Sequence, residues 1–165
     1  MLQQWEGELN TTIKGALAGL AATFPLTLAM SKLDQAFPIR EKQSFPPRKI
    51  VMWLSRILGI KKKMDKNEKT FLTMIGHFAY GALSGTLIKF LISRIPLVVG
   101  VPLLGLSVWI LSYLGWLPVI KFDLSAFKMS SRKNLLMVIA HLVWGSSLAL
   151  IYRGLDRKKL LPAFL

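Results

Sequence analysis

The chain has 165 residues, of which 53% are hydrophobic, with a mean hydropathy of +0.47 and a formal net charge of +14. A soluble domain rarely combines this hydrophobicity with a pI near 10.4, so the composition favours a membrane protein. The basic residues lie between apolar stretches of membrane-spanning length. Insertion in a bilayer explains this distribution better than binding to nucleic acid does. The absence of cysteine excludes disulfides and thiolate metal sites.

The first apolar segment covers residues 12–31. It is long enough to cross a bilayer, because the hydrocarbon core takes about 20 residues of helix. Acidic residues but no basic residue precede Lys14, a charge order unlike that of a cleavable signal peptide. Gly15 and Gly19 share one face of this helix, so they predict close packing against a neighbouring helix.

The loop after this segment contains a second helical pattern over residues 47–60. Its apolar side chains recur at helical spacing and form one face (Ile50, Trp53, Leu54, Ile57, Leu58). Basic residues surround that face (Arg48, Lys49, Arg56, Lys61, Lys62, Lys63). The pattern predicts an amphipathic helix in the membrane interface, with Trp53 and the basic residues at anionic lipid headgroups. A helix that docks a partner protein is the alternative.

Three further segments of membrane-spanning length follow, at residues 71–93, 97–118 and 135–153. None of the four spans contains Asp or Glu. Suitable N-caps are Asn10 or Thr11 for the first span, Asn67 for the second, and Ser130 or Ser131 for the fourth. The connection between the second and third spans is so short that these helices must form an antiparallel hairpin. We therefore expect an all-α bundle of four transmembrane helices, with residues 1–165 forming a single membrane domain.

A 15-residue pattern occurs twice, at residues 75–89 and 139–153, 64 residues apart. Each copy places a histidine, a glycine and another small residue at i, i+4 and i+8, on one helix face. The residues are His77, Gly81 and Gly85 in the first copy and His141, Gly145 and Ala149 in the second. We expect a parallel internal repeat, in which the second and fourth helices contact one another through these small-residue faces.

The distribution of basic residues predicts how the bundle is oriented. The connections between Lys32 and Lys69 and between Lys121 and Lys133 carry fifteen Lys and Arg residues, against seven on the opposite side. Cytoplasmic loops are enriched in these residues. We therefore expect both long loops in the cytoplasm and both termini outside.

Three features resemble the YagU-like family of uncharacterised bacterial inner-membrane proteins. They are the glycines of the first helix (Gly15, Gly19), the Pro46-Pro47-Arg48 sequence, and the element from His141 to Gly145. Together they cover about a third of the chain. The resemblance implies a small multi-pass protein of the bacterial inner membrane and brings no established activity.

His77 and His141 are the only histidines, and the parallel repeat places them at similar depth. One interpretation is that the pair ligates the iron of haem or another tetrapyrrole metal, with the glycines making room for a flat ring. The other is that each histidine hydrogen-bonds a neighbouring helix while the glycines pack. No carboxylate in the spans is available to orient the imidazoles, so we expect the packing role, with no cofactor and no metal.

The spans lack the features of most membrane chemistry. They contain no acidic residue for a proton relay, and their serines have no recognisable base and acid partners. We therefore expect a non-enzymatic protein, either a structural or accessory subunit of a membrane assembly or a stand-alone envelope protein, whose partners are lipid and other subunits or itself. The alternative is a small transporter or channel with a polar cavity near His77 and His141, lined also by Tyr80 and the serines of the spans.

Overall fold

The computed structural model describes residues 2–35, 46–59, 64–91, 96–119 and 126–156. Every regular element within these ranges is helical. The elements are α1 (Leu2–Gln35), α2 (Pro46–Ile57), α3 (Lys66–Gly85), η3 (Thr86–Phe90), α4 (Leu97–Ile110), η4 (Leu111–Trp116), α5 (Leu117–Val119), η5 (Ala126–Lys128) and α6 (Ser131–Leu155). The all-α fold expected from the sequence is confirmed.

Four helical segments are long and apolar enough to cross a membrane: Gly7–Gln35, Lys66–Phe90, Val99–Val119 and Ser131–Leu155. Each leaves large apolar side chains exposed along one face. On α1 these are Leu9, Ile13, Leu17, Leu20, Phe24 and Leu28, which recur every three or four residues. An apolar stripe of this kind on the outside of a bundle fits lipid as its surroundings.

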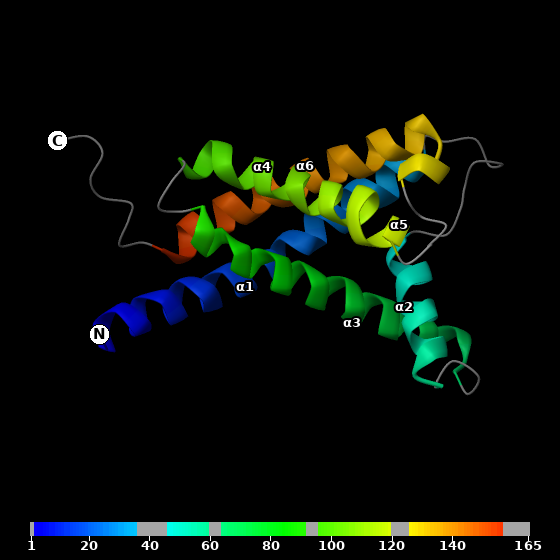
Figure 1. Ribbon diagram of the computed structural model, residues 1–165, viewed down its shortest axis with the longest axis horizontal. Helices are drawn as coiled ribbons and strands as arrows, with labels where there is room; N and C mark the ends of the chain where they lie inside the picture. Colours follow the sequence, from blue (N-terminus) through cyan, green and yellow to red (C-terminus); the bar gives the residue numbers. More distant parts are fainter. Residues whose placement is uncertain (1, 36–45, 60–63, 92–95, 120–125, 157–165) are drawn as a thin grey trace.

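The helices alternate in direction along the chain. In Figure 1, α1 and α4 run one way and α3 and α6 run the other, so the start of α1 and the end of α6 lie at the same end of the bundle. The second and third spans form the antiparallel hairpin that their short connection requires. The two helices that carry the repeat are parallel.

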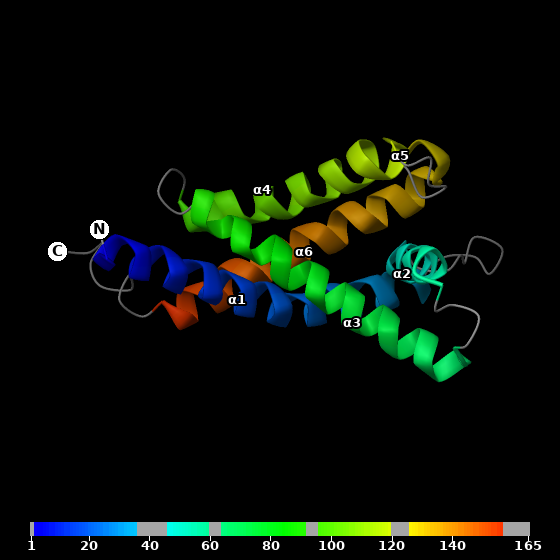
Figure 2. The same ribbon diagram turned by 60° about the horizontal axis from the view of Figure 1, so that its bottom comes forward.

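The helix α2 lies at the opposite end of the bundle and crosses its long axis (Figures 1 and 2). It packs against α3, where a Cβ on Gly76 would come within 2.7 Å of Cγ2 of Val51. Arg48 and Arg56 are exposed, while Trp53 is half-buried. The helix thus covers most of the segment, residues 47–60, for which the sequence predicts an amphipathic helix. Residue 60 and the predicted headgroup contacts Lys61, Lys62 and Lys63 lie outside the described residues.

The N-termini of α3 and α6 are capped by side chains. The carboxylate of Asp65 accepts a hydrogen bond from the backbone N–H of Glu68 at 2.7 Å. In return, the carboxylate of Glu68 accepts one from the backbone N–H of Asp65, also at 2.7 Å, which completes a capping box. Ser130 accepts from the N–H of Lys133 at 3.3 Å, as predicted. The prediction of Asn67 as a cap is wrong, because the helix begins at Lys66, two residues earlier than a cap at Asn67 implies, and its cap is Asp65.

The glycine faces bring two pairs of helices into close contact. A Cβ on Gly19 would lie 2.8 Å from Cα of Gly85, and one on Gly145 would lie 2.9 Å from Cα of Pro102. The first pair is α1 with α3, and the second is α4 with α6. The expected contact between the small-residue faces of α3 and α6 is therefore wrong: α3 turns this face to α1, and α1 packs against both α3 and α6. Small residues show that a face packs closely, but not which helix it meets.

The third span changes its winding partway along. After Ile110 the chain forms the π-helical turns of η4, and the N–H of Leu117 bonds the carbonyl of Ser112 instead of an i−4 carbonyl. Pro118 follows directly. A proline ring clashes with the carbonyl four residues before it, so widening of the preceding turn relieves that clash. The wider turn buries the side chains of Ser112 and Tyr113.

Candidate binding cavity

A cavity of about 210 Å³ lies inside the bundle, towards the end where α2 crosses. In Figure 2, α3 diverges from α4 and α6 in the direction of α2. The wall of the cavity combines side chains from all four spans with apolar side chains of α2. From α2 these are Pro47, Ile50, Val51 and Leu54, of which Ile50 and Leu54 belong to the predicted apolar face. The amphipathic helix therefore closes one side of an internal space while its basic residues remain at the surface.

Most of the wall is apolar, formed by residues such as Leu26, Met30, Val108, Leu117 and Met137. Among the described residues, no Asp, Glu, Lys or Arg lines the cavity. A charged molecule would find no side chain of opposite charge there, and its desolvation would cost several kcal/mol. The cavity is therefore suited to a neutral molecule.

Both histidines lie on this wall. Nδ1 of His141 is 2.7 Å from the carbonyl oxygen of Met137, one helical turn earlier. Within the described part of the chain, the imidazole of His77 has no hydrogen-bond partner and contacts the ring of Phe78 edge-on, with centroids 6.1 Å apart. The structure thus places the two predicted residues around one space, where each retains a nitrogen that is not used by the protein.

A pair of hydroxyl groups joins two sides of the cavity. The hydroxyl of Tyr80 on α3 and Oγ of Ser112 on η4 are 2.8 Å apart. Either oxygen is able to donate, so one hydroxyl hydrogen of the pair remains available to a third group. The π-helical turn is needed for this contact because Ser112 lies within it. The sequence indicates Tyr80 and the serines as candidates to line a polar cavity beside the histidines, but it does not predict the contact between Tyr80 and Ser112, which depends on the turn before Pro118.

Two other polar side chains on the wall, Thr23 and Trp144, already donate hydrogen bonds. Nε1 of Trp144 donates to the carbonyl oxygen of Gly19 at 3.2 Å, and Oγ1 of Thr23 donates to the same oxygen at 2.8 Å. These bonds tie α6 to α1 directly beside the α1–α3 glycine contact. The polar groups that remain for a bound molecule include those of His77, His141 and the Tyr80–Ser112 pair, together with the hydroxyl of Ser84.

The glycine contacts close the bundle beyond the cavity. Gly15, Gly19, Gly81 and Gly85 bring the backbones of α1 and α3 together, and all four are buried. Gly105 and Gly145 do the same for α4 and α6, where a Cβ on Gly105 would lie 3.1 Å from the carbonyl carbon of His141. Ala149 is also buried. Gly105 was missed because no small residue precedes or follows it at a spacing of four.

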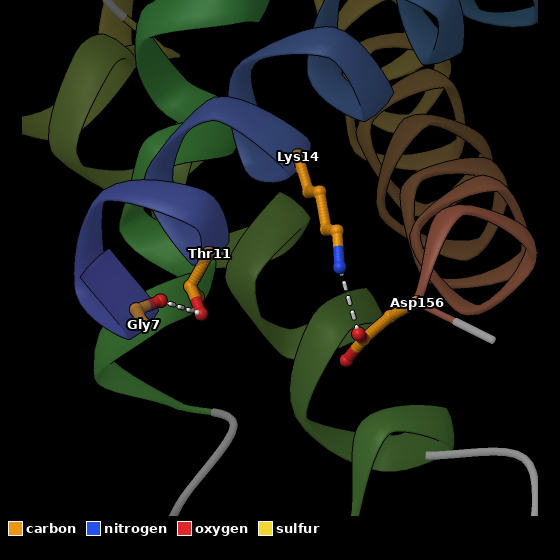
Figure 3. Close-up of polar contacts among 4 residues, drawn as sticks. All are labelled: Gly7, Thr11, Lys14 and Asp156. Carbon is orange, nitrogen blue, oxygen red and sulfur yellow. Dashed lines mark hydrogen bonds and ion pairs between the residues drawn. The ribbon is translucent and has the colours of Figure 1, made fainter. Parts of the chain in front are cut away.

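An ion pair fixes the end of the bundle farthest from the cavity. Nζ of Lys14 lies 2.9 Å from Oδ1 of Asp156, and both side chains are largely shielded (Figure 3). One turn earlier on α1, the hydroxyl of Thr11 donates to the carbonyl of Gly7 at 3.0 Å. The ion pair joins the first helix to the end of the last one. Its two residues are 142 positions apart, so no local sequence pattern predicts their contact.

The size of the cavity bears on the haem interpretation. A cavity of about 150 Å³ holds one benzene molecule, so a space near 210 Å³ holds one substituted ring. A tetrapyrrole has four pyrrole rings, so this volume is smaller than such a ligand. Among the described residues, no three His, Cys, Asp or Glu side chains form a cluster suited to a metal ion.

No family model, curated protein or solved structure matches this chain. The resemblance to the YagU-like family stays a prediction. The class that the fold defines is that of a multi-pass α-helical membrane protein.

Proposed function

We propose that this chain is a non-enzymatic protein of the bacterial inner membrane that binds a small, mostly apolar molecule in the cavity beside His77 and His141. The observation that carries the proposal is the uncharged, mostly apolar cavity at the depth of the two histidines. Binding sites for small molecules are concave and mostly apolar, with a few polar groups that fix orientation. This wall has that composition.

An accessory role suits this arrangement better than a channel. A channel needs a continuous polar path, whereas the backbones of α1 and α3, and of α4 and α6, meet at glycines beyond the cavity. A protein with a concave binding space that does not continue as a polar path, and with lipid-facing sides, is suited to holding a ligand for, or within, a larger membrane assembly. The transporter alternative requires these glycine contacts to separate.

The orientation and lipid contacts belong to the same proposal. Fifteen basic residues against seven favour the α2 end on the cytoplasmic side. There, α2 lies across the bundle axis with Arg48 and Arg56 exposed, a position suited to anionic headgroups. The ligand cavity would then lie in the cytoplasmic half of the membrane, next to the interfacial helix.

The test uses bromobenzene as a one-ring probe. Trp116 and Trp144 line the cavity, and a heavy atom bound beside them quenches their fluorescence. The protein is reconstituted in lipid nanodiscs and titrated with bromobenzene. We expect a saturable quenching component on top of the linear background from probe dissolved in the bilayer.

Two substitutions on α1 form a matched pair for this test. Leu26→Phe places a ring in the cavity from a position that is 6% exposed, whereas Leu28→Phe adds the same ring on the lipid side, at a position 47% exposed. We expect Leu26→Phe to remove the saturable component and Leu28→Phe to keep it. Purely linear quenching in the unmodified protein, or equal quenching in both variants, would contradict the proposal.

A further inference from the structure

The polar groups on the cavity wall restrict the chemistry of the ligand. A carbonyl oxygen only accepts hydrogen bonds, so in the contact between His141 and Met137 it is Nδ1 that carries the hydrogen. In the neutral imidazole, the other nitrogen, Nε2, is then an acceptor. Among the described residues, no protein donor reaches it. A ligand that satisfies this nitrogen must bring a hydrogen of its own.

The opposite side of the cavity provides complementary groups. The Tyr80–Ser112 pair retains one hydroxyl hydrogen, and the imidazole of His77 has one donor and one acceptor nitrogen. Trp144 and Thr23 contribute no further donor, because both already bond the carbonyl of Gly19. The wall therefore offers both donors and acceptors, but no charge.

The remaining constraints concern the shape and the solubility of the ligand. The volume near 210 Å³ corresponds to one substituted ring. Tyr113, Trp116 and Trp144 supply aromatic surfaces, against which a planar ring packs well. Because the cavity lies within segments of membrane-spanning length, the ligand reaches it most directly from the bilayer.

We propose that the cavity binds the hydroxylated ring of a neutral, membrane-soluble phenol or quinol, whose hydroxyl group donates to Nε2 of His141. The hydroxyl oxygen, or a second ring oxygen, accepts from the Tyr80–Ser112 pair or from His77. The rest of such a molecule, an alkyl or isoprenoid chain, extends between the helices into lipid. This inference rests on the proposed function and specifies the ligand class.

The test compares 4-bromophenol with 4-bromoanisole, which has the same ring and bromine but no hydroxyl hydrogen. Each is titrated into nanodiscs at pH 7, where the phenol is protonated, and the saturable tryptophan quenching gives its affinity. One hydrogen bond contributes about 0.5–1.5 kcal/mol, so we expect the phenol to bind about two- to twelvefold more tightly than the anisole. The linear background in the Leu26→Phe variant corrects for unequal partitioning of the two probes.

Variants then assign the preference to named atoms. His141→Leu removes the acceptor, so we expect the affinity ratio of phenol to anisole to fall towards one while bromobenzene still binds. Retained binding of bromobenzene shows that the variant is folded. Ser112→Ala should reduce the ratio by weakening phenol binding, whereas Ser107→Ala should not change it. Ser107 is the matched control because it is exposed on the same span and bonds the carbonyl of Leu103.

The outcomes separate this inference from the proposed function. Saturable binding of bromobenzene without a preference for the phenol would overturn the hydroxylated-ring inference and leave the cavity as a binding site. Displacement of 4-bromophenol by dioctanoylglycerol more readily than by a short-chain ubiquinol would point to a glyceride hydroxyl, and would also overturn it. The absence of saturable binding by any probe would remove both proposals.

Discussion

The α1–α3 contact gives a sharp test of the packing. We consider Gly19→Ala, which adds one methyl group where a Cβ would lie 2.8 Å from Cα and 3.1 Å from the nitrogen of Gly85. Both atoms belong to the backbone of α3, so no side chain is able to move aside. The two helices must separate, and overpacking of this kind costs about 1–3 kcal/mol.

Two hydrogen bonds make this separation more costly. The carbonyl of Gly19 accepts from Trp144 on α6 and from Thr23 on its own helix. A shift of α1 away from α3 therefore also disturbs its contact with α6. At about 2–4 °C per kcal/mol for a chain of this size, we expect the melting temperature to fall by roughly 2–12 °C.

Gly7→Ala is the matched control. Gly7 lies on the same helix, but a Cβ there has nothing within 4 Å. Alanine is the better helix former, so this change should leave the stability unchanged or raise it by up to about 1 kcal/mol. The assay is thermal unfolding of the purified variants in one detergent, followed by circular dichroism. Equal melting temperatures for Gly19→Ala and Gly7→Ala would refute the close approach of α1 and α3.

Three further predictions concern the cap of α3, the ion pair between α1 and Asp156, and the orientation of the bundle in the membrane. Asp65→Ala removes the capping box of α3 and should cost about 1 kcal/mol in thermal unfolding, whereas Asn67→Ala should cost little, and equal losses would contradict the cap assignment. A double-mutant cycle with Lys14→Met and Asp156→Asn should give a coupling energy of up to about 1 kcal/mol that decreases in high salt, and additive effects would indicate that the ion pair is absent. Because the native chain has no cysteine, Lys63→Cys should react with a membrane-impermeant maleimide only after cells are opened, and labelling of intact cells would reverse the proposed orientation.

The helices and caps that depend only on neighbouring residues in the sequence could be predicted from the sequence alone. Residues 12–31, 71–93, 97–118 and 135–153 all lie largely in helices because apolar runs of bilayer length have few other stable conformations. The amphipathic spacing from Ile50 to Leu58 likewise corresponds to a helix, and Ser130 caps α6 because its side chain acts within one turn.

The features that the sequence did not predict depend on distant partners or on local strain. The stripe of Gly81 and Gly85 shows that α3 packs closely, but α1 and α6 were equally able to receive it. Lys14 and Asp156 meet only because α1 and α6 lie side by side. The Tyr80–Ser112 pair requires the wider turn before Pro118. Both histidines lie on the cavity wall, yet that wall is assembled from all four spans and α2, a combination that no short motif encodes.

The most direct test of ligand binding is a crystal structure of the protein soaked with 4-bromophenol, with data collected at the bromine absorption edge. The cavity account expects one dominant anomalous peak between α3, η4 and α6, with the phenol oxygen in hydrogen-bonding distance of His141 or the Tyr80–Ser112 pair. The same soak of the Leu26→Phe variant should lack this peak. Bromine peaks only along the lipid-facing sides, beside residues such as Phe24 and Leu28, would contradict the claim that the cavity is a binding site.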